Sequence, residues 1–104
     1  MTNIPEELYI DENHLVYEIN GNWFSFTKKG NSLMVHWATR NVRKARESSN
    51  QFCNWAFETF PWCRMIIGPI KRRSVVKLAE RCGFIKMFEA KDEKGAFVLV
   101  RTRP

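Results

Sequence analysis

One stretch of helical periodicity, set between two strand-like runs, constrains the fold of this chain more than any other feature of its 104 residues. Apolar and small side chains recur three or four positions apart between residues 42 and 60, which places them on one face of a helix. They are Val42, Ala45, Ser49, Phe52, Ala56 and Phe60. Thr39 or Asn41 can cap the start of this helix, and Pro61 ends it because a residue before proline avoids the α region.

The segment before this helix predicts an antiparallel meander. Asn20-Gly21 is a strong two-residue hairpin signal because both positions tolerate positive φ, and Lys28–Asn31 reads as a second turn. The third strand is mostly apolar on both faces, which is typical of a central strand covered on both sides. The three predicted strands are His14–Ile19, Trp23–Thr27 and Ser32–Ala38.

The segment after the first helix predicts a second helix between short strands. Trp62–Ile67 reads as an apolar strand that Gly68-Pro69 interrupts. The second helix starts at Lys71–Ser74, and Gly83 stands where a left-handed C-terminal cap belongs. Its apolar stripe consists of Val75, Leu78, Ala79 and Cys82, and the final two strands are Phe84–Ala90 and Ala96–Thr102.

The resulting order of elements is β-β-β-α-β-α-β-β. It predicts one α/β (α+β) domain with a mixed, mostly antiparallel sheet of about six strands and two helices on its faces. The length fits one domain and leaves little room for a second.

Charge is divided unevenly along the chain. Residues 1–22 carry five acids and no Lys or Arg, whereas residues 23–104 carry all 17 basic residues and six acids. The two parts therefore have net charges of −5 and +11, which sum to the overall +6. This distribution favours an anionic partner: a phosphate-bearing cofactor, a nucleic acid or an acidic protein.

The sequence predicts neither membrane insertion nor a metal site. No window approaches 18 apolar residues, and the acidic N-terminus does not resemble a signal peptide, so we expect a cytoplasmic protein. The three cysteines, Cys53, Cys63 and Cys82, show neither disulfide nor metal-site spacing. The two histidines, His14 and His36, lie far from them along the chain, so the cysteines read as core residues in a reducing compartment.

Both strand-to-helix junctions are basic. Helix N-termini present unpaired N–H groups and a partial positive charge, which suits phosphate. If the strands ending at Ala38 and Ile67 are parallel neighbours, both junctions open at one sheet edge, where ligands of open α/β sheets bind. We therefore expect an anion-binding cleft lined by Arg40, Arg43, Lys44 and Arg46 from the first junction and Lys71, Arg72 and Arg73 from the second.

The run Arg72–Phe84, RRSVVKLAERCGF, resembles the signature of the GNAT superfamily of N-acetyltransferases. In that signature an Asn opens the helix and Leu-Ala-Glu-Lys-x-Gly-Phe closes it. The closing part is matched by Leu78, Ala79, Glu80, Arg81, Gly83 and Phe84. The element order from about His14 to Arg101 also matches the second to seventh strands of the family. The resemblance implies that residues 1–104 form a GNAT-like domain without the family's first strand and first two helices.

The resemblance also implies acetyl-CoA or coenzyme A as the cofactor. The family's coenzyme A loop reads Arg/Gln-x-x-Gly-x-Gly/Ala, and it corresponds here to Arg40, Asn41, Val42, Arg43, Lys44 and Ala45. Arg40 and Ala45 match, whereas Arg43 replaces a glycine that lets backbone N–H groups approach the pyrophosphate. Arg72 or Arg73 would contact a further phosphate. Arg72 takes the place of the signature Asn, and Ala79 takes the place often held by a Tyr general acid.

The chain is also similar to small GNAT-like bacteriophage internal-virion and head-assembly proteins. This similarity implies a protein that binds a virion or host component. The alternatives are an active N-acetyltransferase, which moves an acetyl group from acetyl-CoA to an amine, and a nucleic-acid-binding protein. Exposed aromatic side chains would suit a homo-oligomer or a capsid contact, and the candidates are one of Trp23 and Phe24, together with Trp55 and Trp62.

Two side chains are candidates for proton transfer. His36 precedes the first junction and has an ordinary pKa near neutrality, although a packed or surface histidine is the alternative. Glu18 lies in a strand near the expected acceptor side and would need burial to raise its pKa. Tyr9 and Tyr17 can donate protons in principle, but they also fit amphipathic strands.

Overall fold

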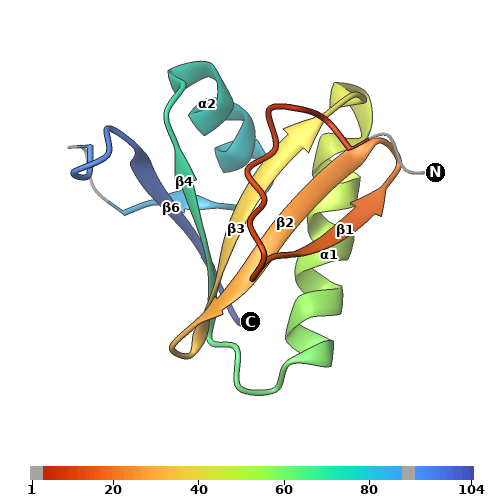
Figure 1. Ribbon diagram of the computed structural model, residues 1–104, viewed down its shortest axis with the longest axis vertical. Helices are drawn as coiled ribbons and strands as arrows, with labels where there is room; N and C mark the ends of the chain where they lie inside the picture. The colour runs from red at the N-terminus through yellow and green to blue at the C-terminus, as the bar shows by residue number, and fades with distance from the viewer. Residues whose placement is uncertain (1–3, 88–90) are drawn as a thin grey trace.

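The computed structural model describes residues 4–87 and 91–104, and these form a mixed α+β domain (Figure 1). Its six-stranded sheet has the strand order β1-β2-β3-β4-β6-β5, with every neighbouring pair antiparallel except β3 and β4. The expected fold class is confirmed. In chain order the elements are β1 (Leu15–Ile19), β2 (Asn22–Lys29), β3 (Ser32–Thr39), α1 (Ala45–Thr59), β4 (Met65–Ile70), α2 (Arg73–Arg81), β5 (Ile85–Lys86) and β6 (Phe97–Thr102).

The first three strands form the expected antiparallel meander. Asn20 and Gly21 have φ of 54° and 77°, so both residues of the first hairpin turn adopt the left-handed conformation that such turns require. Gly30, in the second turn, has a φ of 64°. The carboxylate of Glu18 accepts a hydrogen bond from the Gly21 amide at 2.9 Å, which braces the first turn.

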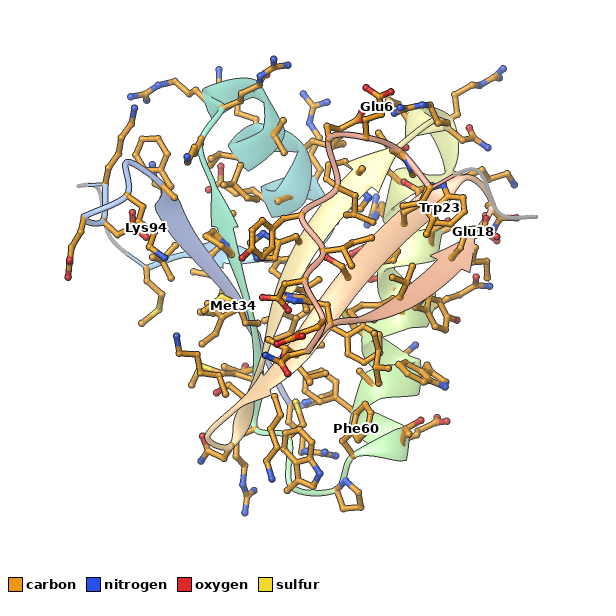
Figure 2. All side chains as sticks on the ribbon, viewed as in Figure 1. Glu6, Glu18, Trp23, Met34, Phe60 and Lys94 are labelled. Carbon is orange, nitrogen blue, oxygen red and sulfur yellow. The ribbon has the colours of Figure 1, made fainter. Side chains whose placement is uncertain are left out.

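The parallel pair β3 and β4 separates after three residues. Its register is Ser32 with Met65, Leu33 with Ile66 and Met34 with Ile67. Beyond that point β3 runs on to Thr39 and β4 to Ile70 without pairing to each other. Figure 2 shows Met34 in the middle of the molecule, at the level where the two strands begin to part.

The predicted bounds of this fourth strand were wrong at both ends. Gly68 and Pro69 continue β4, opposite Leu99 and Val98 of β6. Proline is tolerated there because the edge of β4 that faces β3 has no strand partner at this point. At the other end, residues 60–63 form a turn in which the amide of Cys63 donates to the carbonyl of Phe60.

Both helices pack on the same face of the sheet. This face carries Leu33, Ile66 and Arg101, which the register places side by side. Helix α1 buries Phe52 there, stacked on Phe24 at 4.5 Å between ring centroids. Helix α2 buries Val76 against Phe97 and Leu99, also on that face. The stripe predicted for α1 is confirmed at Ala45, Ser49, Phe52 and Ala56, whereas Val42 is exposed. The stripe predicted for α2 was wrong in omitting Val76, which is the buried residue of that helix.

The start of α1 differs from its prediction. Residues Val42–Lys44 form a 3₁₀ turn, and the α-helix begins at Ala45. Neither expected cap bonds a helical N–H through its side chain. Instead, the hydroxyl of Thr39 accepts a hydrogen bond from the amide of Asn41 at 2.9 Å, which turns the chain out of β3.

The end of α2 follows its prediction. Gly83 has a φ of 94°, and its amide donates to the carbonyl of Glu80. The amide of Phe84 donates to the carbonyl of Ala79, which completes a Schellman motif. The predicted strand Phe84–Ala90 is represented by β5, and residues 88–90 lie outside the described part of the chain.

The opposite face of the sheet is crossed by residues 4–14, which we call the N-terminal strap. Figure 1 shows the strap running in front of β2 and β3. Leu8 anchors it in a small buried cluster with Trp23 and Ala38, and the hydroxyl of Ser25 donates to the carbonyl of Tyr9. In the described ranges no helix is long and apolar enough to cross a membrane.

Candidate functional site: a cleft between diverging strands

A cleft of about 300 Å³ opens where β3 and β4 separate. This volume is at the lower end of the range of roughly 300–1,000 Å³ typical of small-molecule sites. Three parts of the chain meet around it: the strap, the two diverging strands, and the sides of α1 and α2 that pack on the sheet. Its principal lining residues are Glu7, Tyr9, Val35, His36, Trp37, Phe52, Gly68, Lys71, Arg72, Val75, Ala79 and Cys82.

The walls of the cleft include two unpaired strand edges. The carbonyl oxygen of Val35 lies 3.8 Å from the position that a β-carbon on Gly68 would take, so it points across the gap toward β4. Because strand residues two apart present their backbone groups to the same edge, the N–H and C=O of Trp37 face the cleft as well. An extended ligand with amide groups can therefore pair with this edge as an added strand would.

The helix side of the cleft is apolar. Phe24, Phe52, Val75, Ala79 and Phe84 line it. Gly68 adds space, since a β-carbon built there would meet only the Val35 carbonyl oxygen within 4 Å. This wall suits an aliphatic chain or a thioester better than a charged group.

The start of α2 supplies the positive charge of the cleft. Lys71 and Arg72 both line it. No acidic residue lies in the first turn of α2 and no side chain caps it, so its free N–H groups and helix dipole add to this charge. Arg73 points elsewhere, with its guanidinium 5.5 Å from the ring of Phe97.

The first junction lies outside the cleft lining. Val42, Arg43 and Lys44 are exposed, and Ala45 is buried at the helix start. The carbonyl of Asn41 accepts a hydrogen bond from the buried side-chain amide of Asn22 at 3.1 Å. Residues 40–45 are thus held beside the cleft rather than in it. Arg43 has no positive φ, so the backbone of this turn does not require glycine.

Arg40 connects this junction to the cleft through Glu7. Both terminal nitrogens of Arg40 donate to the Glu7 carboxylate, at 2.6 and 2.8 Å. These hydrogen bonds lower the pKa of Glu7 to about 2. Glu7 itself lines the cleft. Its carboxylate thus occupies Arg40, the arginine that the sequence predicted to bind an anion.

His36 reaches the cleft from β3 and contacts two residues of the strap there. Its ring lies 4.8 Å from the ring of Tyr9 and 5.7 Å from that of His14, measured between centroids. Nδ1 of His14 is 2.6 Å from a carboxylate oxygen of Asp11. Burial, followed by the charge of His14, lowers the pKa of His36, which favours a neutral imidazole at pH 7.

The other proton-transfer candidates are placed less favourably. Glu18 is exposed at the far end of β1, on the right of Figure 2, and does not line the cleft. Ala79 does line it and has no proton to give. Tyr9 brings a phenol to the cleft from the strap instead.

Sequence reasoning missed the contribution of the strap. Glu7, Tyr9 and His14 are separated from β3 by two strands, and no spacing pattern links them to His36. The excess of acids in residues 1–22 was the one available signal, because an acidic segment tends to lie on a basic surface. Within the described ranges, no three His, Cys, Asp or Glu residues are arranged to hold a metal ion.

Comparison with known proteins connects this geometry to a fold. No family model and no curated protein sequence matches the chain. Solved structures do match: an acetyltransferase from Agrobacterium tumefaciens, at 17% identity and a TM-score of 0.59, and a chimera of the Vibrio cholerae spermidine N-acetyltransferase SpeG and hSSAT, at 16% and 0.65. The chain has the GNAT acetyltransferase fold. A domain from Methanocaldococcus jannaschii also matches, at 12% identity and a TM-score of 0.65.

The GNAT match covers most of this chain but less of its neighbours. It includes 79% of this chain and 53% of the Agrobacterium protein, and 88% of this chain and 71% of the SpeG chimera. The chain therefore spans about half the length of the first of these structures. At these identities the similarity establishes the GNAT fold, and function has to be argued from the cleft.

Proposed function

We propose that this protein is an N-acetyltransferase that moves an acetyl group from acetyl-CoA to an amine. The observation that carries the proposal is the cleft itself. On a GNAT fold, it combines an open strand edge at Val35 and Trp37, an apolar wall, and two cations at the start of α2. These features match the three chemical parts of the donor, which are amides, an aliphatic thioester and phosphates.

The residues present fit acetyl-CoA part by part. The backbone groups of Val35 and Trp37 would pair with amides of the pantetheine arm. Lys71, Arg72 and the free N–H groups of α2 would hold a phosphate. When bound, acetyl-CoA supplies an acyl thioester that is activated toward attack by an amine.

His36 is the residue of the cleft best suited to accept a proton. An amine is largely protonated at neutral pH and must lose a proton before its lone pair can attack a carbonyl. A lowered pKa keeps His36 unprotonated, and thus ready to accept that proton, at neutral pH. Positioning of the two reactants in one cleft would supply most of the remaining rate enhancement.

Release of free coenzyme A thiol with a panel of amines tests this function. The panel should include a polyamine, a lysine-containing peptide and a peptide with a free α-amine. We expect acetyl-CoA to raise the melting temperature and at least one amine to give turnover that His36→Gln reduces by about 10²-fold or more. Absence of both stabilisation and turnover at millimolar acetyl-CoA would refute the proposal.

The other roles expected from the sequence remain predictions. Co-purification with a virion or host protein would support a binding role, particularly if it survived Arg72→Ala. Nucleic-acid binding would weaken steeply as salt increases, because it depends on contacts to phosphates.

A further inference from the structure

The arrangement of His14 has no explanation in the fold. Its side chain is only 5% exposed, and its Nδ1 is held by Asp11 at 2.6 Å. Its other nitrogen, Nε2, is buried and has no hydrogen-bond partner within the described part of the chain. A buried polar atom without a partner destabilises a fold, and an apolar ring of the same shape would avoid that cost. Packing alone therefore does not explain why a histidine occupies this position.

The surroundings of His14 point to proton transfer. Its ring lies against those of Tyr9 and His36, with centroids 5.3 and 5.7 Å away. Both neighbours line the cleft. On its other side His14 contacts Asp11, whose side chain is 42% exposed to solvent. His14 thus stands between a histidine at the cleft and a carboxylate at the surface.

We propose that His36, His14 and Asp11 form a relay that carries the proton released by acetyl transfer from the cleft to solvent. The proposal rests on the proposed function and adds two positioning residues, His14 and Asp11, to it. Proton transfer between the imidazoles proceeds through one water or after a small ring rotation, since Nε2 makes no direct hydrogen bond in this arrangement.

The proton balance of the reaction calls for such an exit. An ammonium substrate gives one proton to His36 and becomes a neutral amine. The amine then forms a bond to the acetyl carbon, the carbon–sulfur bond breaks, and the second amine proton goes to the leaving thiolate. The products are an amide, a free thiol and one proton on His36. That proton must leave before the next turnover, and His14 with Asp11 provides the route.

Several charged and polar residues surround the relay. On the strap, Asp11 faces His14, while Tyr9 contacts both imidazoles. The charge of Lys94, in the β5–β6 turn, also acts on His36. The remaining charged residues that line the same cleft are Glu7, Lys71 and Arg72. Of these residues, only Asp11 is altered by the two substitutions that test the relay, His14→Phe and Asp11→Asn.

Histidine NMR of the full chain without acetyl-CoA is the first experiment, and it needs no activity. We expect the His14 ring to carry its proton on Nδ1, a preference that Asp11→Asn abolishes and Glu12→Gln preserves. Glu12→Gln is a matched control because it makes the same charge change at the next residue. His14→Phe keeps a buried ring, and we expect it to raise the pKa of His36, because the variant lacks the positive charge of the protonated His14 ring that lowers this pKa. Unchanged titration of His36 in this variant would overturn the relay.

The second experiment compares acetyl-transfer rates across pH. We expect His14→Phe and Asp11→Asn to lower kcat by roughly tenfold or more, with KM for acetyl-CoA unchanged, and Glu12→Gln to behave as the unaltered protein. The acid limb of the His14→Phe profile should move to higher pH. An active protein whose His14→Phe variant keeps its rate and pH profile would disprove the relay alone. An unaltered protein with no turnover would overturn the proposed function and the relay together.

Discussion

The carboxylate of Glu7 binds both terminal nitrogens of Arg40, with Oε2 2.6 Å from Nη1 and Oε1 2.8 Å from Nη2. Such bidentate geometry is also how arginine binds a phosphate. The strap therefore holds an internal anion on the arginine that the family resemblance assigns to the pyrophosphate. Both side chains are more than half exposed, so an incoming anion can reach them.

We predict that Glu7→Gln tightens binding of coenzyme A by up to about fivefold, because it frees Arg40 and the contribution of an exposed ion pair is small. Isothermal titration calorimetry measures this directly. Glu6→Gln is the control, since it makes the same charge change without removing these hydrogen bonds. The pKa of Glu7 falls from 4.5 to about 2. The ion pair therefore stabilises the folded protein above about pH 4.5, and this stabilisation is lost as the pH falls toward 2. Equal effects of the two variants would show that only overall charge matters.

The two arginines at the start of α2 should differ in ligand binding. Arg72 lines the cleft, whereas Arg73 lies over Phe97. We expect Arg72→Ala to weaken binding of coenzyme A by about tenfold, as loss of one phosphate contact does, and Arg73→Ala to change it little. A larger loss in Arg73→Ala would place the phosphate outside this cleft.

Gly68 offers a way to fill the cleft without disturbing the sheet. Its φ is not in the left-handed region, and a β-carbon there would lie 3.8 Å from the carbonyl oxygen of Val35, an ordinary contact. Gly68→Ala should therefore fold and bind normally. Gly68→Leu should fold but lose acetyl-CoA binding by at least about tenfold, measured by thermal shift. Normal binding by Gly68→Leu would contradict the assignment of the donor to this cleft.

Asn22 should be important for stability although it is polar. It is fully buried, its Oδ1 accepts a hydrogen bond from Nε1 of Trp37 at 3.1 Å, and its amide nitrogen donates to Asn41 and Ser48. Asn22→Leu leaves these partners without their hydrogen bonds, and we expect a loss of about 2 kcal/mol in the free energy of unfolding. Urea denaturation measures it. The exposed helical position Asn54→Ala should stay within about 0.5 kcal/mol.

Burial of Cys53 predicts the response of the fold to alkaline pH. Burial raises the pKa of this thiol from 9.0 to about 11. Because the folded protein retains the proton more tightly, stability is fully present below pH 9 and declines by up to about 2 kcal/mol as pH rises toward 11. Denaturation of Cys53→Ala across this range should show a shallower decline. An identical slope in both proteins would mean that other groups cause it.

Local chemistry accounts for the order of elements and for their approximate bounds. The spacing of Phe52 and Ala56 predicted α1, Asn20-Gly21 predicted the first turn, and Gly83 predicted the end of α2. Each signal acts through neighbours in the chain, either by helical periodicity or by backbone conformation at one residue. The same kind of reasoning failed at Gly68-Pro69, because whether a proline interrupts a strand depends on which strand lies beside it.

The site depends on contacts between residues that are distant in the chain. The basic residues of α2 could be read as ligand-binding from the sequence, since they stand at a helix start. The placement of Glu7 on Arg40, and of His14 beside His36, follows from the path of the strap across the sheet. That path is set by burial of Leu8 against Trp23 and Ala38. These residues are distant from Leu8 in the sequence, so no local pattern predicts the contact.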